Sequence, residues 1–144
     1  MKRLRVMLVS AALLSAACFT AEATRVPEPE EIDPSQASAD AVQVVVTDHR
    51  FDISTGHAKA GTIDFVVRND ADEPHEFVIV PRDGDRYGMP LGEIEPFEPG
   101  QTRALRAQLA PGSYEFVCLI IDVIDGEPKS HMSVGMKTGF EVTP

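Results

Sequence analysis

The chain has 144 residues, a formal net charge of -10 and 43% hydrophobic residues, which fits one globular domain and leaves little room for a second. With 2 Cys among 10 Gly and 11 Pro, it is neither a low-complexity chain nor a disulfide-rich miniprotein. The acidic balance argues against nucleic-acid binding, because that function needs a basic surface that displaces phosphate counterions.

Residues 1–23 have the pattern of a secretory signal peptide. Three basic residues precede a short apolar run over residues 6–19, and the small residues Ala21 and Ala23 fit the site cut by signal peptidase. We expect cleavage after Ala23 and export to the periplasm or another extracytoplasmic compartment. Cleavage removes three basic residues and one acidic residue, so the mature chain would carry a net charge of -12.

One cysteine, Cys18, lies in the predicted signal peptide, and the other, Cys118, lies in the predicted domain. One alternative to simple cleavage is a lipoprotein signal in which Cys18 is acylated and anchors the protein to a membrane. After cleavage at Ala23, Cys118 is the single cysteine left and has no partner for an intramolecular disulfide. A lone thiol in an oxidising compartment is at risk of oxidation unless it is buried or bound to a metal. Cys118 therefore requires an explanation.

Residues 24–39 are rich in Pro and Glu and contain almost nothing to bury, so they predict a flexible, solvated spacer. The domain is expected at residues 40–144, where short apolar runs with a period of two predict β-strands. Residues 82–96, with two prolines and three glycines, predict an irregular excursion. Seven or eight strands in about 105 residues predict an all-β, antiparallel Greek-key sandwich. The runs are Val42–Thr47 and those around Phe65, Phe77, Ala107, Phe116 and Phe140.

Four residues spread along the domain carry metal-binding groups. His75 shares the parity of the apolar residues that follow it, and Cys118 shares that of Phe116, so both side chains are expected to point inward. The string HMSVGM then supplies His131 and, five residues later, Met136. Two imidazoles, one thiolate and one thioether form the ligand set of a trigonal copper site with a long axial methionine.

The stretches VVRNDADEPHEFVIV, PGSYEFVC and HMSVGMKTGFEV resemble the ligand segments of the cupredoxins, the family of plastocyanin and azurin. The resemblance extends over residues 42–144 and preserves the order His, Cys, His, Met. It implies one copper ion that cycles between Cu(I) and Cu(II), with His75, Cys118 and His131 as equatorial ligands and Met136 as the axial one.

Two departures from this family pattern concern the ligand loops. Twelve residues separate Cys118 from His131, where plastocyanin and azurin have two to four. A loop of this length is expected to hold His131 less rigidly and to cover its exposed edge. Plastocyanin also has an asparagine after the first histidine that ties the ligand loops together, whereas this chain has Glu76, so the bracing of the site is expected to differ.

The other candidate groups have simpler explanations. His49 and His57 are expected in solvent-exposed loops, and Met132 as a bystander, because only Met136 has the His-x4-Met spacing. Acidic residues between Cys118 and His131 are expected at a solvated surface. They are Asp122, Asp125 and Glu127.

The resemblance and the residues together predict a one-electron carrier, not an enzyme. It would dock transiently with a cytochrome or an oxidase, and we expect it to be monomeric. The alternative function is a module that buffers copper or delivers it, for example to a respiratory oxidase. The chain has no His-x-His pair for further copper ions, which disfavours a multicopper oxidase.

Overall fold

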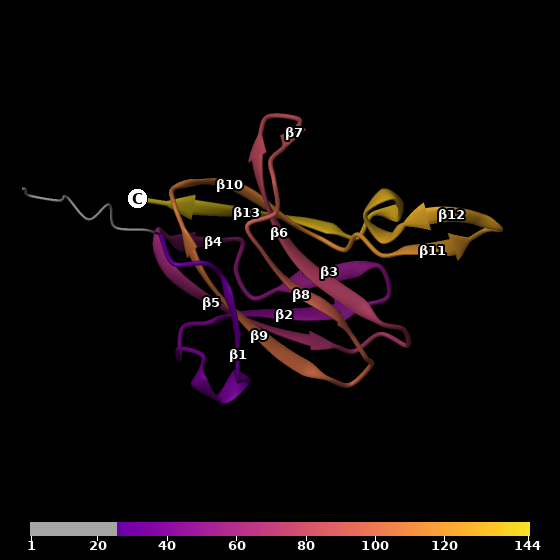
Figure 1. Cartoon of the computed structure of the whole chain (residues 1–144), viewed down its shortest axis with the longest axis horizontal. Coiled ribbons are helices and arrows are strands. Elements are labelled where there is room, and N and C mark those ends of the chain that lie inside the picture. Colours follow the sequence, from indigo (N-terminus) through magenta and orange to yellow (C-terminus); the bar gives the residue numbers. More distant parts are fainter. Residues whose placement is uncertain (1–25) are drawn as a thin grey trace, which may run out of the picture.

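A computed structural model describes residues 26–144. The predicted signal peptide and the alternative lipidation site at Cys18 lie outside these residues. The described part of the chain is built of β-strands, with two short 3-10 turns and no α-helix (Figure 1). None of its helical segments is long and apolar enough to cross a membrane.

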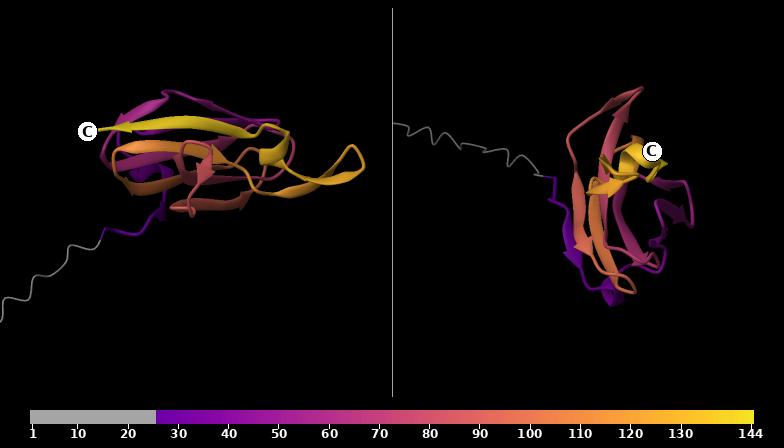
Figure 2. Two further views of the ribbon diagram at one scale, coloured as in Figure 1. Left: turned by 90° about the horizontal axis from the view of Figure 1, so that it is seen from above. Right: turned by 90° about the vertical axis from the view of Figure 1, so that its right-hand side faces the viewer.

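Two sheets pack face to face, and a separate hairpin extends from one end (Figure 2). The first sheet has the order β1 (Glu30–Ile32), β9 (Thr102–Leu109), β5 (Gly61–Asn69), β2 (Val42–Thr47), β3 (Arg50–Ile53). The second has the order β4 (His57–Lys59), β13 (Lys137–Thr143), β10 (Gly112–Val117), β6 (His75–Asp83), β7 (Arg86–Tyr87), and β8 (Gly92–Phe97) also pairs with β6. The hairpin consists of β11 (Ile121–Ile124) and β12 (Glu127–Ser130), and the 3-10 turns are η1 (Pro34–Gln36) and η2 (His131–Val134).

The predicted all-β sandwich is confirmed, with two differences in detail. The pairs β2–β5 and β4–β13 are parallel, whereas the other pairs are antiparallel. The described residues also contain more strands than predicted, because strands of two to four residues such as β1, β4 and β7 are too short to show a period-two pattern.

The core lies between the sheets and is dominated by phenylalanine. The ring of Phe65 contacts those of Phe77, Phe116 and Phe140 at centroid distances of 5.7, 5.3 and 5.7 Å. All four side chains are buried, as their positions in the alternating runs predict. These contacts between rings from four strands fix how the two sheets stack.

The predicted spacer is wrong for part of its length. Within residues 24–39, β1 adds an edge strand to the first sheet by pairing with β9. The buried carboxylate of Asp64 then accepts hydrogen bonds of 2.8 Å from the Arg106 guanidinium and of 2.8 Å from the Ser38 main chain. The ordered domain therefore begins near residue 30 and not at 40. Main-chain pairing at a sheet edge needs no apolar side chains, so composition did not reveal it.

Residues 82–96 are not irregular either. They include the end of β6, the short strand β7 and most of β8, which pairs with β6. The β6–β8 register shifts between His75 and Phe77, and Pro96 lies on β8 within the shifted stretch. Proline is tolerated in a strand at an edge or a bulge, where its missing N–H breaks no ladder hydrogen bond.

Three connections between strands lie at one end of the sandwich. The β2–β3 turn, the β5–β6 loop and the β11–β12 hairpin lie at this end, and the C-terminus lies at the other (Figure 1). The four predicted ligand residues sit next to these connections in the chain.

Candidate metal centre

His75 is the first residue of β6 and is fully buried. Its side chain lies on the same face of the strand as Phe77 and Ile79, which are also buried, so the parity argument is confirmed. The bulge in the neighbouring strand β8 falls beside it. Bulges commonly redirect side chains at functional sites, and here the irregular register accompanies the entry of an imidazole into an apolar core.

Cys118 directly follows β10 and is also fully buried. Its main-chain N–H donates to the Met136 carbonyl at 3.3 Å, and its own carbonyl accepts from the Met132 N–H at 2.8 Å. Cys118 is therefore held by the segment that carries the other two candidate ligands, His131 and Met136.

His131 and Met136 are brought together by a single tight turn. His131 begins η2, whose first turn is capped by the Ser130 hydroxyl, and Gly135 ends it with φ of 114°. This left-handed conformation favours glycine, and it lets the Met136 N–H reach back to the His131 carbonyl at 2.9 Å. The glycine before the methionine is thus a geometric requirement of the spacing His-x4-Met. Met136, like His131, is buried.

The long segment between Cys118 and His131 is an ordered hairpin, contrary to the expectation of a loose loop. Asp125 and Gly126, with φ of 56° and 80°, form the two-residue turn between β11 and β12. At the base of the hairpin the His131 N–H donates to the Ile120 carbonyl at 2.9 Å. The added residues therefore leave the core and return to it, and their paired ends hold Cys118 and His131 close together (Figure 2).

The three strongest candidate ligands converge on one point. The Cys118 Sγ lies 3.9 Å from the Nδ1 of His75 and 3.5 Å from the Nδ1 of His131, and the two Nδ1 atoms are 3.1 Å apart. One metal ion bonded at about 2 Å to nitrogen and about 2.3 Å to sulfur spans such separations. Met136 belongs to the same buried core cluster as Cys118. The four residues form the His-Cys-His-Met donor set typical of a single type 1 copper site.

The electrostatics of the site also fit a metal. Burial, with smaller contributions from the neighbouring His131 and His49, lowers the pKa of His75 to about 4, and burial also lowers the pKa of His131. Both imidazoles are therefore neutral at pH 7 and have a lone pair to offer. Burial raises the pKa of the Cys118 thiol to about 11, opposed by main-chain hydrogen bonds at Glu76 and Ile120. A cation is needed to hold this sulfur as a thiolate.

Glu76 connects the ligand loops, although plastocyanin has an asparagine at this position. Its carboxylate accepts a hydrogen bond from the main-chain N–H of Leu119, the residue after Cys118. Burial raises the pKa of Glu76. The carboxylate joins the first-histidine strand to the cysteine loop, so the bracing is present with a different side chain.

The remaining candidates divide into those placed as expected and those that are not. Met132 packs outside the main core against Val78, Val80 and Val117. The acidic residues of the hairpin are exposed, as predicted: Asp122, Asp125 and Glu127. His57 is exposed but begins strand β4 instead of lying in a loop.

His49 and Glu73 lie near the site, although the sequence did not predict either of them there. His49 lies in the β2–β3 turn as predicted but is only one-third exposed, and its ring meets that of His131 at 4.5 Å. Glu73 lies in the β5–β6 loop, two residues before His75. The two-residue spacing between Thr47 and Arg50 signals a hairpin turn, but nothing local shows that this turn lies over a ligand.

The chain is similar to a known protein family in sequence and to solved structures in fold. A family model described as the cupredoxin-like domain matches residues 7–127, which include His75 and Cys118. No curated protein matches the sequence. The structure is similar to an auracyanin from the photosynthetic bacterium Roseiflexus castenholzii, with a TM-score of 0.57 and 19% identity over 75% of this chain and 99% of that one.

Two other auracyanins show the same likeness. Auracyanin B has a TM-score of 0.56 and 17% identity over 83% of this chain and 99% of its own. Auracyanin A from Chloroflexus aurantiacus, a "blue" copper protein, has a TM-score of 0.51 and 14% identity over 72% of this chain and 98% of its own. At these identities the likeness concerns the fold alone. Since the family model covers most of the sequence, the chain belongs to the cupredoxin-like domain family.

Proposed function

We propose that this protein is an exported one-electron carrier whose type 1-like copper site is formed by His75, Cys118, His131 and Met136. The proposal rests on the convergence of one sulfur and two Nδ1 atoms, all buried, within 3.9 Å of one another. Bound copper would supply reversible one-electron chemistry between Cu(I) and Cu(II), and a ligand set between the preferences of the two states keeps rearrangement small.

The protein supplies a prearranged and dry set of ligands. Main-chain hydrogen bonds join Cys118 to Met136 and Met136 to His131, so three of the four residues are positioned by one another. All four side chains are at most 1% exposed, which excludes water from the donor atoms. Low exposure favours the same coordination in both oxidation states, because there is no solvent to add as a further ligand.

A surface suited to transient docking lies beside this centre. Apolar side chains are exposed directly after Cys118, along β11 and on η2. Small apolar patches with a charged surround are typical of weak, short-lived interfaces. The mature charge of -12 suits a basic face on a cytochrome or an oxidase. The exposed apolar residues are Leu119, Ile121, Val123 and Val134.

Copper delivery is the second candidate, and we prefer the carrier. A loose segment between Cys118 and His131 would favour delivery, because a loose ligand loop exchanges metal readily. That segment is a paired hairpin whose base is closed by the His131–Ile120 hydrogen bond, which weakens the argument for an open site.

The test is a Cu(II) titration of the purified protein, followed by visible absorption and electron spin resonance. We expect an intense blue or green thiolate-to-copper band at one equivalent, absent in Cys118→Ser. A matched control is Met132→Leu, which leaves the donor set intact. A colourless protein that binds only Cu(I) would favour delivery, and a protein that binds neither ion would overturn both functions.

A further inference from the structure

A second group of metal-binding side chains adjoins the copper centre. His49, Glu73 and His131 each offer one donor atom, and these atoms lie within 4.8 Å of one another. The His49 Nε2 is 3.4 Å from a carboxylate oxygen of Glu73. The rings of His49 and His131 meet nearly at right angles, with centroids 4.5 Å apart. His131 is therefore shared between two clusters.

The two nitrogens of His131 face different surroundings. Its Nδ1 lies close to the Nδ1 of His75 and the sulfur of Cys118, and is thus committed to the copper site. Its Nε2 is buried and has no hydrogen-bond partner in the described part of the protein, and the same holds for the Nε2 atoms of His49 and His75. A buried polar atom without a hydrogen bond is costly. The Nε2 atoms of His49 and His75 lie 3.4 and 3.8 Å from the same Glu73 oxygen, so among the described residues the Nε2 of His131 has neither a hydrogen bond nor an ion pair and requires an explanation.

Both additional side chains are held by ordered backbone. His49 lies in the two-residue turn between β2 and β3, where Asp48 adopts φ of 48°. Glu73 lies in a loop fastened by Asn69, whose buried amide donates to the Glu73 carbonyl at 2.9 Å and accepts from the Ala71 N–H at 3.0 Å. Both residues therefore lie in short connections between strands, and the Glu73 loop is fixed by hydrogen bonds.

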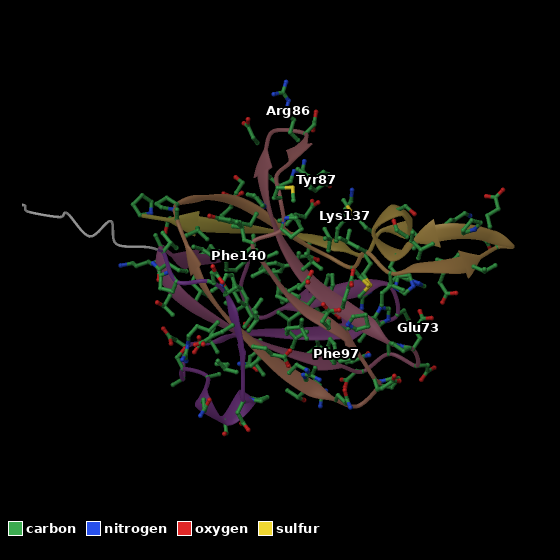
Figure 3. The ribbon with its side chains drawn as sticks, viewed as in Figure 1. Glu73, Arg86, Tyr87, Phe97, Lys137 and Phe140 are labelled. Atoms are coloured by element: carbon green, nitrogen blue, oxygen red, sulfur yellow. The ribbon has the colours of Figure 1, made fainter. Side chains whose placement is uncertain are left out.

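The cluster is also accessible from outside. A surface hollow is lined by two of the three cluster residues, His49 and Glu73, together with Ala71, Asp48 and Asp72. Glu73 lies at the hairpin end of the sandwich (Figure 3). Acidic walls draw cations towards the hollow. An ion that entered it would reach His49 and Glu73 before the buried edge of His131.

We propose that His49, Glu73 and the Nε2 of His131 form a second site, which binds a divalent transition-metal cation of the zinc type. Two imidazoles and one carboxylate are a common donor set for such ions, with a water molecule as fourth ligand. His131 would then hold one cation at each of its two nitrogens, and the proton on Nε2 would pass to solvent when zinc binds. The sharing of His131 rests on the proposed copper site, whereas binding at His49 and Glu73 does not.

The experiment adds Zn²⁺ to the copper-loaded protein and follows heat and visible absorption together. We expect one further equivalent of zinc and a shift of the thiolate-to-copper band, because His131 becomes a shared ligand. His49→Ala and Glu73→Gln should each weaken zinc binding by about tenfold or more. His57→Ala and Glu127→Gln, an exposed histidine and an exposed glutamate elsewhere, should leave it unchanged.

The blue band tests the copper carrier, and the binding of zinc tests the second site. If the blue band forms but zinc adds no further equivalent, or binds His49→Ala and Glu73→Gln as tightly as the original protein, the second site is wrong. If no blue band forms at all, the carrier is wrong. The second site is then tested in Cys118→Ser by nuclear magnetic resonance of the His49 ring, which must shift with zinc and must stop shifting in Glu73→Gln.

Discussion

The main-chain N–H of Met136 donates a hydrogen bond of 2.9 Å to the carbonyl oxygen of His131. Gly135 makes this contact possible through its left-handed backbone, with φ of 114°. Two candidate ligands five residues apart are thereby fixed relative to one another before any metal binds.

Gly135→Ala should therefore disturb both folding and the metal centre. No atom lies close enough to clash with an added Cβ, so the expected cost of about 1 to 2 kcal/mol in unfolding free energy comes from backbone strain alone. Gly139→Ala is the control, because Gly139 also has open space but no positive φ. Urea unfolding of both metal-free variants measures the difference. Equal stabilities would contradict the assigned role of Gly135.

The two neighbouring methionines should respond differently to the same substitution. Met136→Leu removes a thioether donor, so we expect the reduction potential to rise, because Cu(II) loses more than Cu(I) when a ligand is removed. Met132→Leu, outside the donor set, should leave the potential unchanged. Both swaps conserve volume and should cost less than about 1.5 kcal/mol in stability. Voltammetry of the two copper-loaded variants provides the measurement, and equal potentials would remove Met136 from the ligand set.

The sequence was sufficient for those parts of the site that depend on strand periodicity. His75 and Cys118 lie at ends of strands whose alternation is clear, and both point inward as their parity indicates. His131 and Met136 follow from their spacing around Gly135, which constrains the chain locally. Local patterns are thus enough where the position of a ligand is set by its own strand or turn.

The features that the sequence did not reveal depend on contacts between distant segments. β1 pairs with β9 across about 70 residues, and its polar side chains give no period-two signal. His49 approaches His131 only because the β2–β3 turn and η2 lie at the same end of the sandwich. The β11–β12 hairpin is a different case, since Asp125-Gly126 is a strong local signal for a two-residue turn that could have been recognised.

Glu76 should support copper affinity through the hydrogen bond that its carboxylate accepts and not through its charge. Glu76→Ala removes the acceptor that holds the Leu119 N–H, so Cys118 loses a brace. We expect Cu(I) affinity to fall by about 10- to 100-fold, as for other residues that orient metal ligands. Glu76→Gln keeps a carbonyl oxygen in place and should retain most of the affinity. Competition with a chromophoric chelator measures both, and an equal loss in the two variants would show that charge is what matters.

The metal-free protein should lose stability between pH 6.5 and pH 4. Burial, with smaller contributions from His131 and His49, lowers the pKa of His75 from 6.5 to about 4, whereas Asp48 acts in the opposite direction. The unfolded chain therefore binds a proton at His75 at higher pH than the folded chain does. The unfolding free energy contributed by this group is complete above pH 6.5 and falls by up to about 3 kcal/mol as the pH drops to 4. Urea unfolding at a series of pH values measures the slope, which His75→Gln should reduce. An unchanged slope in that variant would place the acid sensitivity elsewhere.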